Sequence, residues 1–384
     1  MMNFEVIGLK DLFLAPIFLV SILFLAYLIG RRKYSGSPPL NTYFIAGLSL
    51  KLMGALAFTA IYQLYYSGGD TTVYYKGGTV IWEALMNKPS DGMALLFQKA
   101  NHIDVNTSRY TELIPHFRSA EGFTMHKICA VVGLFTFNSY IASSLVFAVL
   151  SFSGLWVLYL TFIKKYPDIY KQLAFAVLFI PSVTFWGSGM LKDTVTLGCL
   201  GWIVYCCYSL FFERRRNPLL LIMLAICIFL VLKLKAYIFL SLIPALFFWV
   251  YLNLRKAIAN QLVKWTLTPI IIIGALWLGF VVINTIGNEV EKYKAENLEN
   301  LAKGFHSWHS SQGESAYSLG DIEFTPTGIA SKIPASLNVT YFRPFLWETH
   351  SPVIFLSALE SLAFLTFTLY AVSYTHLTLP TMRT

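Results

Sequence analysis

The chain has 384 residues, of which 56% are hydrophobic and 13% are charged. Soluble domains are usually about 45–50% apolar and about 25% charged, so this composition excludes a soluble enzyme, a disordered chain and a disulfide scaffold. Lys and Arg outnumber Asp and Glu by 29 to 20. In a soluble protein this excess would suggest nucleic-acid binding, but here we attribute most of it to membrane topology and expect no nucleic-acid partner.

Apolar stretches long enough to cross a bilayer recur along the sequence. A span needs about 20 mostly apolar residues, and hydropathy predicts an all-α integral membrane protein, a polytopic bundle of about nine transmembrane helices. We expect the spans at residues 12–29, 52–66, 141–163, 173–186, 194–212, 218–232, 236–254, 267–286 and 353–371. The first stretch is not a signal peptide, since it lacks a basic start and a small-residue cleavage site.

Basic residues gather in the short loops between these spans. The clusters are Arg31-Arg32-Lys33, Lys164-Lys165 with Lys171, Arg214-Arg215-Arg216, and Arg255-Lys256 with Lys264. With nine spans, all of these clusters fall on one face. The positive-inside rule makes that face cytoplasmic and places the N-terminus on the extracytoplasmic side.

Residues 218–254 are apolar apart from Lys233 and Lys235. A single helix of about 37 residues would be about 55 Å long, whereas the hydrocarbon core is about 30 Å thick. One crossing would also place Arg255 and Lys256 outside the cell. The sequence therefore predicts a helical hairpin that turns at residues 232–236, with both lysines on the external face.

Two long loops, at about residues 67–128 and 287–352, are predicted on the extracytoplasmic face. In the second, residues 288–303 read as an amphipathic helix and residues 307–320 as a Ser/Gly-rich loop. No repeat or linker separates these parts, so residues 1–371 are expected to form a single polytopic membrane domain. The cysteines lie in apolar segments without metal-ligand spacing and read as small core residues: Cys129, Cys199, Cys206, Cys207 and Cys227.

The last residues, 372–384, differ in character from the rest of the chain. Their string SYTHLTLPT resembles the conceptual translation of a sequencing-library transposon adapter at the end of a metagenomic gene fragment. We therefore expect the natural protein to continue beyond Ala371 and this tail to be non-native. An ordinary polar tail after the last span is the alternative.

The first candidate site is YYSGGDTTVYY at residues 65–75. A span ends in aromatic residues, two glycines free the backbone, and Asp70 follows just above the membrane, close to Tyr74. Asp70 fits a general base for an acceptor hydroxyl or a ligand of a cation. The structural alternative is that Gly68 and Gly69 end one helix and Asp70 caps a second over residues 71–85, with the tyrosines as an interfacial belt.

The second candidate is PSVTFWGSGMLKD at residues 181–193. A proline kinks the end of a span, and a Gly-Ser-Gly turn then leads from Trp186 to Lys192 and Asp193 at the next helix start. The amides of that helix start, assisted by Lys192, are suited to an anion such as a lipid-linked phosphate. A tight external hairpin with a self-satisfied Lys-Asp pair is the alternative.

The third candidate is the pair Lys233 and Lys235 at the predicted hairpin tip. Charges between spans are costly unless they reach water or a partner, so they are functional candidates. Snorkelling to lipid headgroups is the alternative.

The fourth candidate is YFRPFLWETHSP at residues 341–352, just before the last span. Arg343 suits bidentate recognition of a phosphate, and Trp347 offers a face on which a sugar can stack. Glu348 is placed either to orient Arg343 or to act as a base, with His350 nearby. An interfacial aromatic belt with a structural Arg-Glu pair is the alternative. Glu360 is a further carboxylate inside the last span.

These motifs resemble a group of bacterial envelope proteins, the O-antigen-polymerase-like and polyprenyl-phosphate-dependent membrane glycosyltransferases. The resemblance rests on GGDTTVYY after an early span, on PSVTFWGSGMLKD, and on FRPFLWE before a late span followed by SALESL. It implies a helical bundle in the bacterial cytoplasmic (inner) membrane with its active site at the extracytoplasmic face. Many such enzymes carry paired acidic residues directly after the first span; here a single Asp70 follows the second.

The sequence thus predicts a glycosyltransferase or repeat-unit polymerase that acts on a polyprenyl-diphosphate-linked glycan. Lys192 and Arg343 would bind the diphosphate, and Asp70 or Glu348 would deprotonate the acceptor. The sequence indicates no cofactor, and it does not exclude a divalent cation. The alternatives are a transporter or flippase of a lipid-linked or anionic substrate, and a non-catalytic envelope assembly protein.

Overall fold

The computed structural model describes residues 6–256 and 325–378, with isolated positions and short runs between 266 and 323. Six of the described helices are long and apolar enough to cross a membrane, which confirms an all-helical protein of several candidate spans. The contacts divide the chain into two units, Met1–Gly279 and Phe280–Thr384, and each is described by itself. Nine spans were expected, whereas the described residues contain six candidate spans. The expected span at 267–286 lies largely outside the described residues.

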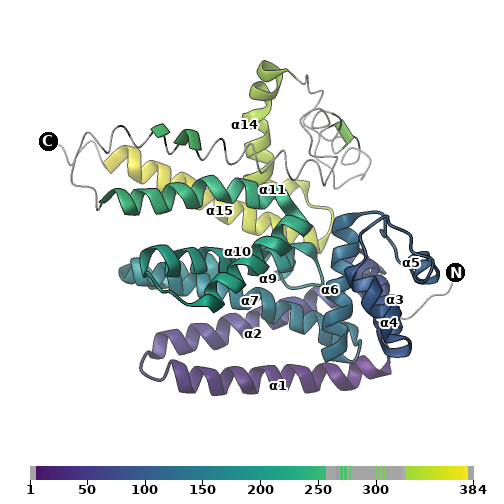
Figure 1. The fold of residues 1–384 in the computed structure, drawn as a ribbon. Coiled ribbons are helices and arrows are strands. Elements are labelled where there is room, and N and C mark those ends of the chain that lie inside the picture. The colour runs from purple at the N-terminus through teal and green to yellow at the C-terminus, as the bar shows by residue number, and fades with distance from the viewer. Residues whose placement is uncertain are drawn as a thin grey trace. The chain divides into compact units, whose positions relative to one another are not determined.

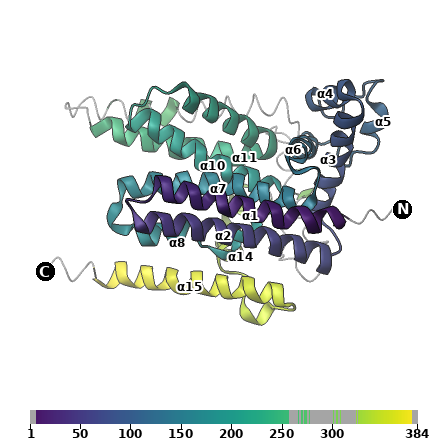
Figure 2. The same cartoon turned by 90° about the horizontal axis from the view of Figure 1, so that it is seen from below.

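The bundle of the first unit is built on four long helices (Figures 1 and 2). Helix α1 (Leu9–Lys33) turns back into α2 (Pro38–Ala60), which continues as a π-helical turn (Ile61–Tyr65). Helix α7 (Tyr140–Lys165) packs on this pair, and α10 (Lys192–Cys207), continued by the π-helical turn Tyr208–Phe212, packs on α7. The second span therefore begins well before residue 52, because the expected start was set by hydropathy alone.

Helices α7 and α10 cross in direct backbone contact. A Cβ atom added to Gly154 would lie 1.9 Å from the carbonyl oxygen of Gly198, and one added to Gly201 would lie 2.0 Å from the carbonyl oxygen of Gly154. Small residues allow this approach, as is common where helices pack inside membranes. Lys192 is the first residue of the same helix α10.

The expected span at 173–186 is broken into two short helices, α8 (Tyr170–Leu178) and α9 (Pro181–Trp186). Neither is long enough to be one of the candidate spans. The break falls at the residues before Pro181, since proline disfavours helical geometry in the residue that precedes it.

Helix α11 (Pro218–Lys256) is non-helical at Lys235, where φ is −149° and ψ is 70°. Beyond this break, the ring centroid of Trp249 lies 4.6 Å from that of Phe212, just before the helix begins. The second half of α11 therefore doubles back toward its own start. This confirms the hairpin and its turn within residues 232–236.

The expected loop at 67–128 is largely helical. It contains α3 (Asp70–Asn87), α4 (Pro89–Phe97), α5 (Ser108–Thr111) and the start of α6 (Ala120–Thr136). We call residues 70–136 the helical cap. It has its own core, which includes Ile81, Leu95 and Phe123, and it lies at the end of the bundle away from the α1–α2 turn in both views.

In the second unit, α14 (Pro326–Phe342) leads through a 3-10 turn (Leu346–Glu348) into α15 (Pro352–Thr378). Residues Pro352–Thr375 of α15 are a candidate span, which covers the expected span at 353–371. The expected amphipathic helix at 288–303 and the loop at 307–320 lie almost entirely outside the described residues. The non-native origin of residues 372–384 stays a prediction.

Candidate functional site

The helical cap meets the bundle at the start of α10, where Lys192 is the first helical residue. The Nζ of Lys192 lies 3.6 Å from the Oε2 of Glu121, in the first turn of α6. It also lies 5.9 Å from the ring centroid of Tyr74 on α3. Three helices thus bring a cation, a carboxylate and a phenol together, and Lys192 and Tyr74 were both singled out from the sequence.

The break of α11 adds two lysines to this junction. The Nζ of Lys235 lies 2.5 Å from the Oδ1 of Asp193, the neighbour of Lys192. Lys233 is close enough to Lys127 on α6 for its positive charge to help lower the pKa of Lys127 to about 8, although burial is the larger cause. Repulsion between ammonium groups favours binding of an anion nearby, since an anion would relieve it. We call Lys127, Lys192, Lys233 and Lys235 the lysine cluster.

Tyr74 is almost fully buried, with 3% of its surface exposed. Burial raises the pKa of its phenol, and the negative charges of Asp70, Glu121 and Asp193 raise it further. The hydroxyl therefore stays protonated at neutral pH, so Tyr74 can donate a hydrogen bond. Three carboxylates thus lie within electrostatic range of one phenol, and the predicted Asp70 and Asp193 are two of them.

Asp70 is exposed at the first position of α3. The N-cap of this helix is Gly69, with a φ of +154° that glycine adopts readily, so the structural alternative in which Asp70 itself caps the helix is wrong in that detail. The helix over residues 71–85 is confirmed as part of α3. The side chain of Asp70 is exposed in the first turn of α3.

A buried hydrogen-bond network holds the first turn of α3 against the bundle. The hydroxyl of Tyr140, on α7, lies 2.8 Å from the Oγ1 of Thr71. The Nε2 of Gln63 donates to that hydroxyl at 2.9 Å and to the Oγ1 of Thr72 at 2.7 Å. These contacts fix the direction in which α3 leaves the bundle, and with it the position of Asp70.

Trp186 belongs to an aromatic group beside Asp70. Its ring packs edge-on to Phe58 at 5.7 Å and to Tyr62 at 6.3 Å between centroids, and 49% of its surface is exposed. A Cβ atom on Gly69 would lie 2.6 Å from the ring of Tyr62, so the group directly adjoins the start of α3. A half-exposed indole beside a carboxylate is suited to the apolar face of a sugar.

The remaining predicted residues lie in the second unit. Arg343 donates from Nε to the Oε2 of Glu348 at 3.1 Å and from a second nitrogen to Oε1. Glu348 also accepts from the backbone N–H of Phe345 at 2.9 Å. The hydrogen bonds from Arg343 hold the pKa of Glu348 below its usual range, which suits a residue that orients Arg343 better than a base. Trp347 and His350 are exposed in the same segment.

Three residues of interest were missed by the sequence reasoning. Glu121 and Lys127 lie on α6, in a segment read as the end of a loop, and only tertiary packing brings them to Lys192 and Lys233. Lys51 lies inside α2 with 2% of its surface exposed, and its Nζ donates to the carbonyl oxygen of Val183 at 2.9 Å. The expected second span began at residue 52, so it left Lys51 out. A span predicted to begin earlier would have shown Lys51 as a charged residue within an apolar stretch.

Among the described residues, no group of three or more His, Cys, Asp or Glu side chains is placed to hold a metal ion. No protein-family model, no curated protein and no solved structure matches this chain.

Proposed function

We propose that the chain is a membrane glycosyltransferase or repeat-unit polymerase that acts on a polyprenyl-diphosphate-linked glycan at the extracytoplasmic face. The lysine cluster carries the proposal. It gathers cations from α6, α10 and α11 at the junction with the cap, at the end of the bundle away from the α1–α2 turn. The basic loops, including the α1–α2 turn, would face the cytoplasm by the positive-inside rule.

The chemistry follows from the charges of the site. A lipid diphosphate is a leaving group whose developing negative charge fixed cations stabilise. Lys192 and Lys235 would contact this diphosphate, and the protonated hydroxyl of Tyr74 would donate a further hydrogen bond. Asp70 would accept the proton of the acceptor hydroxyl as that oxygen attacks the anomeric carbon.

Carbohydrate and phosphate would make further contacts. The indole of Trp186, beside Asp70, would stack on a sugar of the glycan. The second unit, considered by itself, would bind a phosphate through Arg343, with Glu348 holding the guanidinium in place. Trp347 and His350 would contact carbohydrate in the same segment. These assignments propose one lipid-linked donor and one sugar acceptor, with no resident cofactor.

The direct test uses purified protein and a polyprenyl-diphosphate oligosaccharide, with product length read on a gel. We expect Lys192→Gln and Asp70→Asn each to reduce chain extension at least 100-fold. Lys99→Gln is the matched control, because Lys99 is an exposed lysine of the same cap. Full extension by both variants would refute the proposal.

Transport of a lipid-linked or anionic substrate is a second candidate, and one observation favours it. Lys51 is buried inside a candidate span. It contacts the short helix α9, which follows the interruption between helices α8 and α9. Broken helices and intramembrane charges mark substrate paths in transporters. Movement of a fluorescent polyprenyl-linked sugar across proteoliposomes, without glycan extension, would replace the first proposal with this one.

A further inference from the structure

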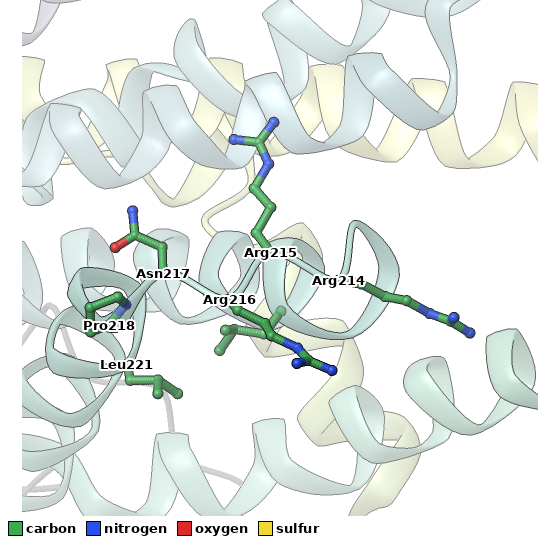
Figure 3. Close-up of a pocket in the computed structure, with 7 residues that line it drawn as sticks. Arg214, Arg215, Arg216, Asn217, Pro218 and Leu221 are labelled. Carbon is green, nitrogen blue, oxygen red and sulfur yellow. The ribbon is translucent and has the colours of Figure 1, made fainter.

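A separate cavity lies at the other end of α10, in the loop that leads to α11. It has a volume of about 630 Å³, and Figure 3 shows the side chains that line it. Its lining includes three consecutive arginines, Arg214, Arg215 and Arg216, and the apolar residues Leu210 and Leu221. The loop connects two candidate spans, one that ends at Phe212 and one that begins at Pro218.

The three arginines are not equivalent. The Nε of Arg215 lies 2.9 Å from the Oε2 of Glu213, and the Oε1 of Glu213 also lies 2.7 Å from the Nζ of Lys164. Glu213 is thus shared by two cations already. Neither Arg214 nor Arg216 forms an ion pair with a residue that the structure describes, so their charges are uncompensated there.

The backbone of the loop separates the arginines further. Arg214 has a φ of +53°, and the N–H of Arg215 donates to the carbonyl oxygen of Ser209 at 3.0 Å. Figure 3 shows the side chains of Arg214 and Arg216 extending to one side and that of Arg215 to the other. A left-handed residue at a helix end is usually glycine, yet this position carries a long cation.

The start of α11 does not explain the arginines. Asn217 satisfies the first amides of this helix, since Leu219 N donates to its Oδ1 at 3.0 Å and Leu220 N to its carbonyl oxygen at 3.1 Å. The positive-inside rule accounts for the side of the membrane on which the arginines lie. It does not account for two arginines that line a cavity and form no ion pair with a described residue.

We propose that this cavity binds the phosphate group of an anionic phospholipid, held by Arg214 and Arg216. Guanidinium groups suit phosphate because they donate paired hydrogen bonds. The apolar wall distinguishes a lipid from free phosphate: Leu221 is 57% exposed at the start of an apolar helix, where an acyl chain would lie. Lys165 adds a further positive charge at the level of the lipid headgroups. Its Nζ lies 5.1 Å from the ring centroid of Trp249.

The test measures lipid retained by the purified full chain in detergent, by native mass spectrometry with phosphatidylglycerol and phosphatidylcholine. The double variant Arg214→Gln/Arg216→Gln should weaken phosphatidylglycerol binding on the order of 30-fold. Arg215→Gln is the matched control and should change binding by less than about threefold, because Glu213 already offsets that charge. Phosphatidylcholine, in which the choline cation offsets the phosphate charge, should lose less than about threefold in any variant.

A second variant separates binding from folding. Arg214→Gly places glycine at a left-handed position, so it should keep or raise the unfolding temperature while it weakens phosphatidylglycerol binding. Equal losses in the double variant, in Arg215→Gln and in Arg214→Gly would indicate unspecific attraction to the loop and overturn the proposal, as would no loss in any of them. Displacement of the lipid by millimolar inorganic phosphate, with no preference between lipids, would overturn the assignment to a lipid.

Discussion

Lys235 and Asp193 join the turn of α11 to the first turn of α10, with Nζ and Oδ1 2.5 Å apart. The two residues are 42 positions apart in the sequence. Both were singled out separately, Lys235 as a charge at a hairpin tip and Asp193 as part of a Lys-Asp pair at a helix start. In the fold, Asp193 therefore pairs with Lys235, and its neighbour Lys192 lies near Glu121 instead.

This ion pair can be tested by exchanging its charges. Asp193→Asn should lower the free energy of unfolding by no more than about 1 kcal/mol, since the Asp193 side chain is 56% exposed and the pair is screened by water. The double variant Asp193→Lys/Lys235→Asp should recover most of that loss. Chemical unfolding in detergent measures both, and a double variant less stable than either single variant would contradict the pairing.

Tyr140 provides a test of the start of α3. Its hydroxyl is fully buried and hydrogen-bonded to Gln63 and Thr71. Tyr140→Phe should cost about 1–3 kcal/mol, because the buried Thr71 and the half-buried Gln63 each lose a hydrogen-bond partner. Tyr27→Phe, at a residue that is 50% exposed, is the control and should change the unfolding temperature little. Equal unfolding temperatures for the two variants would contradict the network.

The sequence predicted the features that depend on local composition. Charge and length together predicted the turn at Lys235, and a glycine pair predicted the start of α3. The cap was not predicted, because residues 67–128 lack long apolar runs and their short helices are stabilised by packing on one another. Glu121 and Lys127 were missed for the same reason: their place beside Lys192 and Lys233 depends on how α6 packs against α11 and near the start of α10, which no local pattern encodes.

Lys127 should make anion binding depend on pH. Its pKa is lowered to about 8, so the ammonium group loses its proton as the pH rises through about 8, well before an ordinary lysine would. Binding of a polyprenyl diphosphate should therefore weaken between pH 7 and pH 9. Lys127→Arg should retain binding at pH 9, because a guanidinium stays charged. Tryptophan fluorescence titrations at both values measure this.

The lowered pKa of Lys127 weakens anion binding as the pH rises but has the opposite effect on the stability of the fold. The unfolded chain holds a proton on Lys127 up to about pH 10.4, whereas the folded chain releases it near pH 8, so unfolding takes up a proton between these values. The contribution of Lys127 to stability thus rises with pH in this window. If binding and stability fell together from pH 8 to pH 9, the assignment to Lys127 would be wrong.

The crossing of α7 and α10 should be intolerant of any side chain at Gly154. Gly154→Val would force a Cβ atom to within 1.9 Å of the Gly198 carbonyl oxygen, so the helices must separate, at a cost of about 3 kcal/mol or more. Gly36→Ala is the control, since nothing lies within 4 Å of a Cβ atom there. Thermal unfolding in detergent should show a large loss for the first variant alone, and a stable Gly154→Val would contradict the close crossing.

Lys51 separates the two candidate functions. It is buried in α2 and donates to one carbonyl oxygen, and it forms no ion pair with a described residue. Burying a charge costs more than one hydrogen bond returns, so Lys51→Met should leave the unfolding temperature unchanged or raise it. A transporter that uses this charge would lose substrate movement in the same variant, despite its stability. Under the glycosyltransferase proposal, chain extension depends on Lys192 and Asp70 at the cap, so Lys51→Met should retain at least half of the wild-type extension rate.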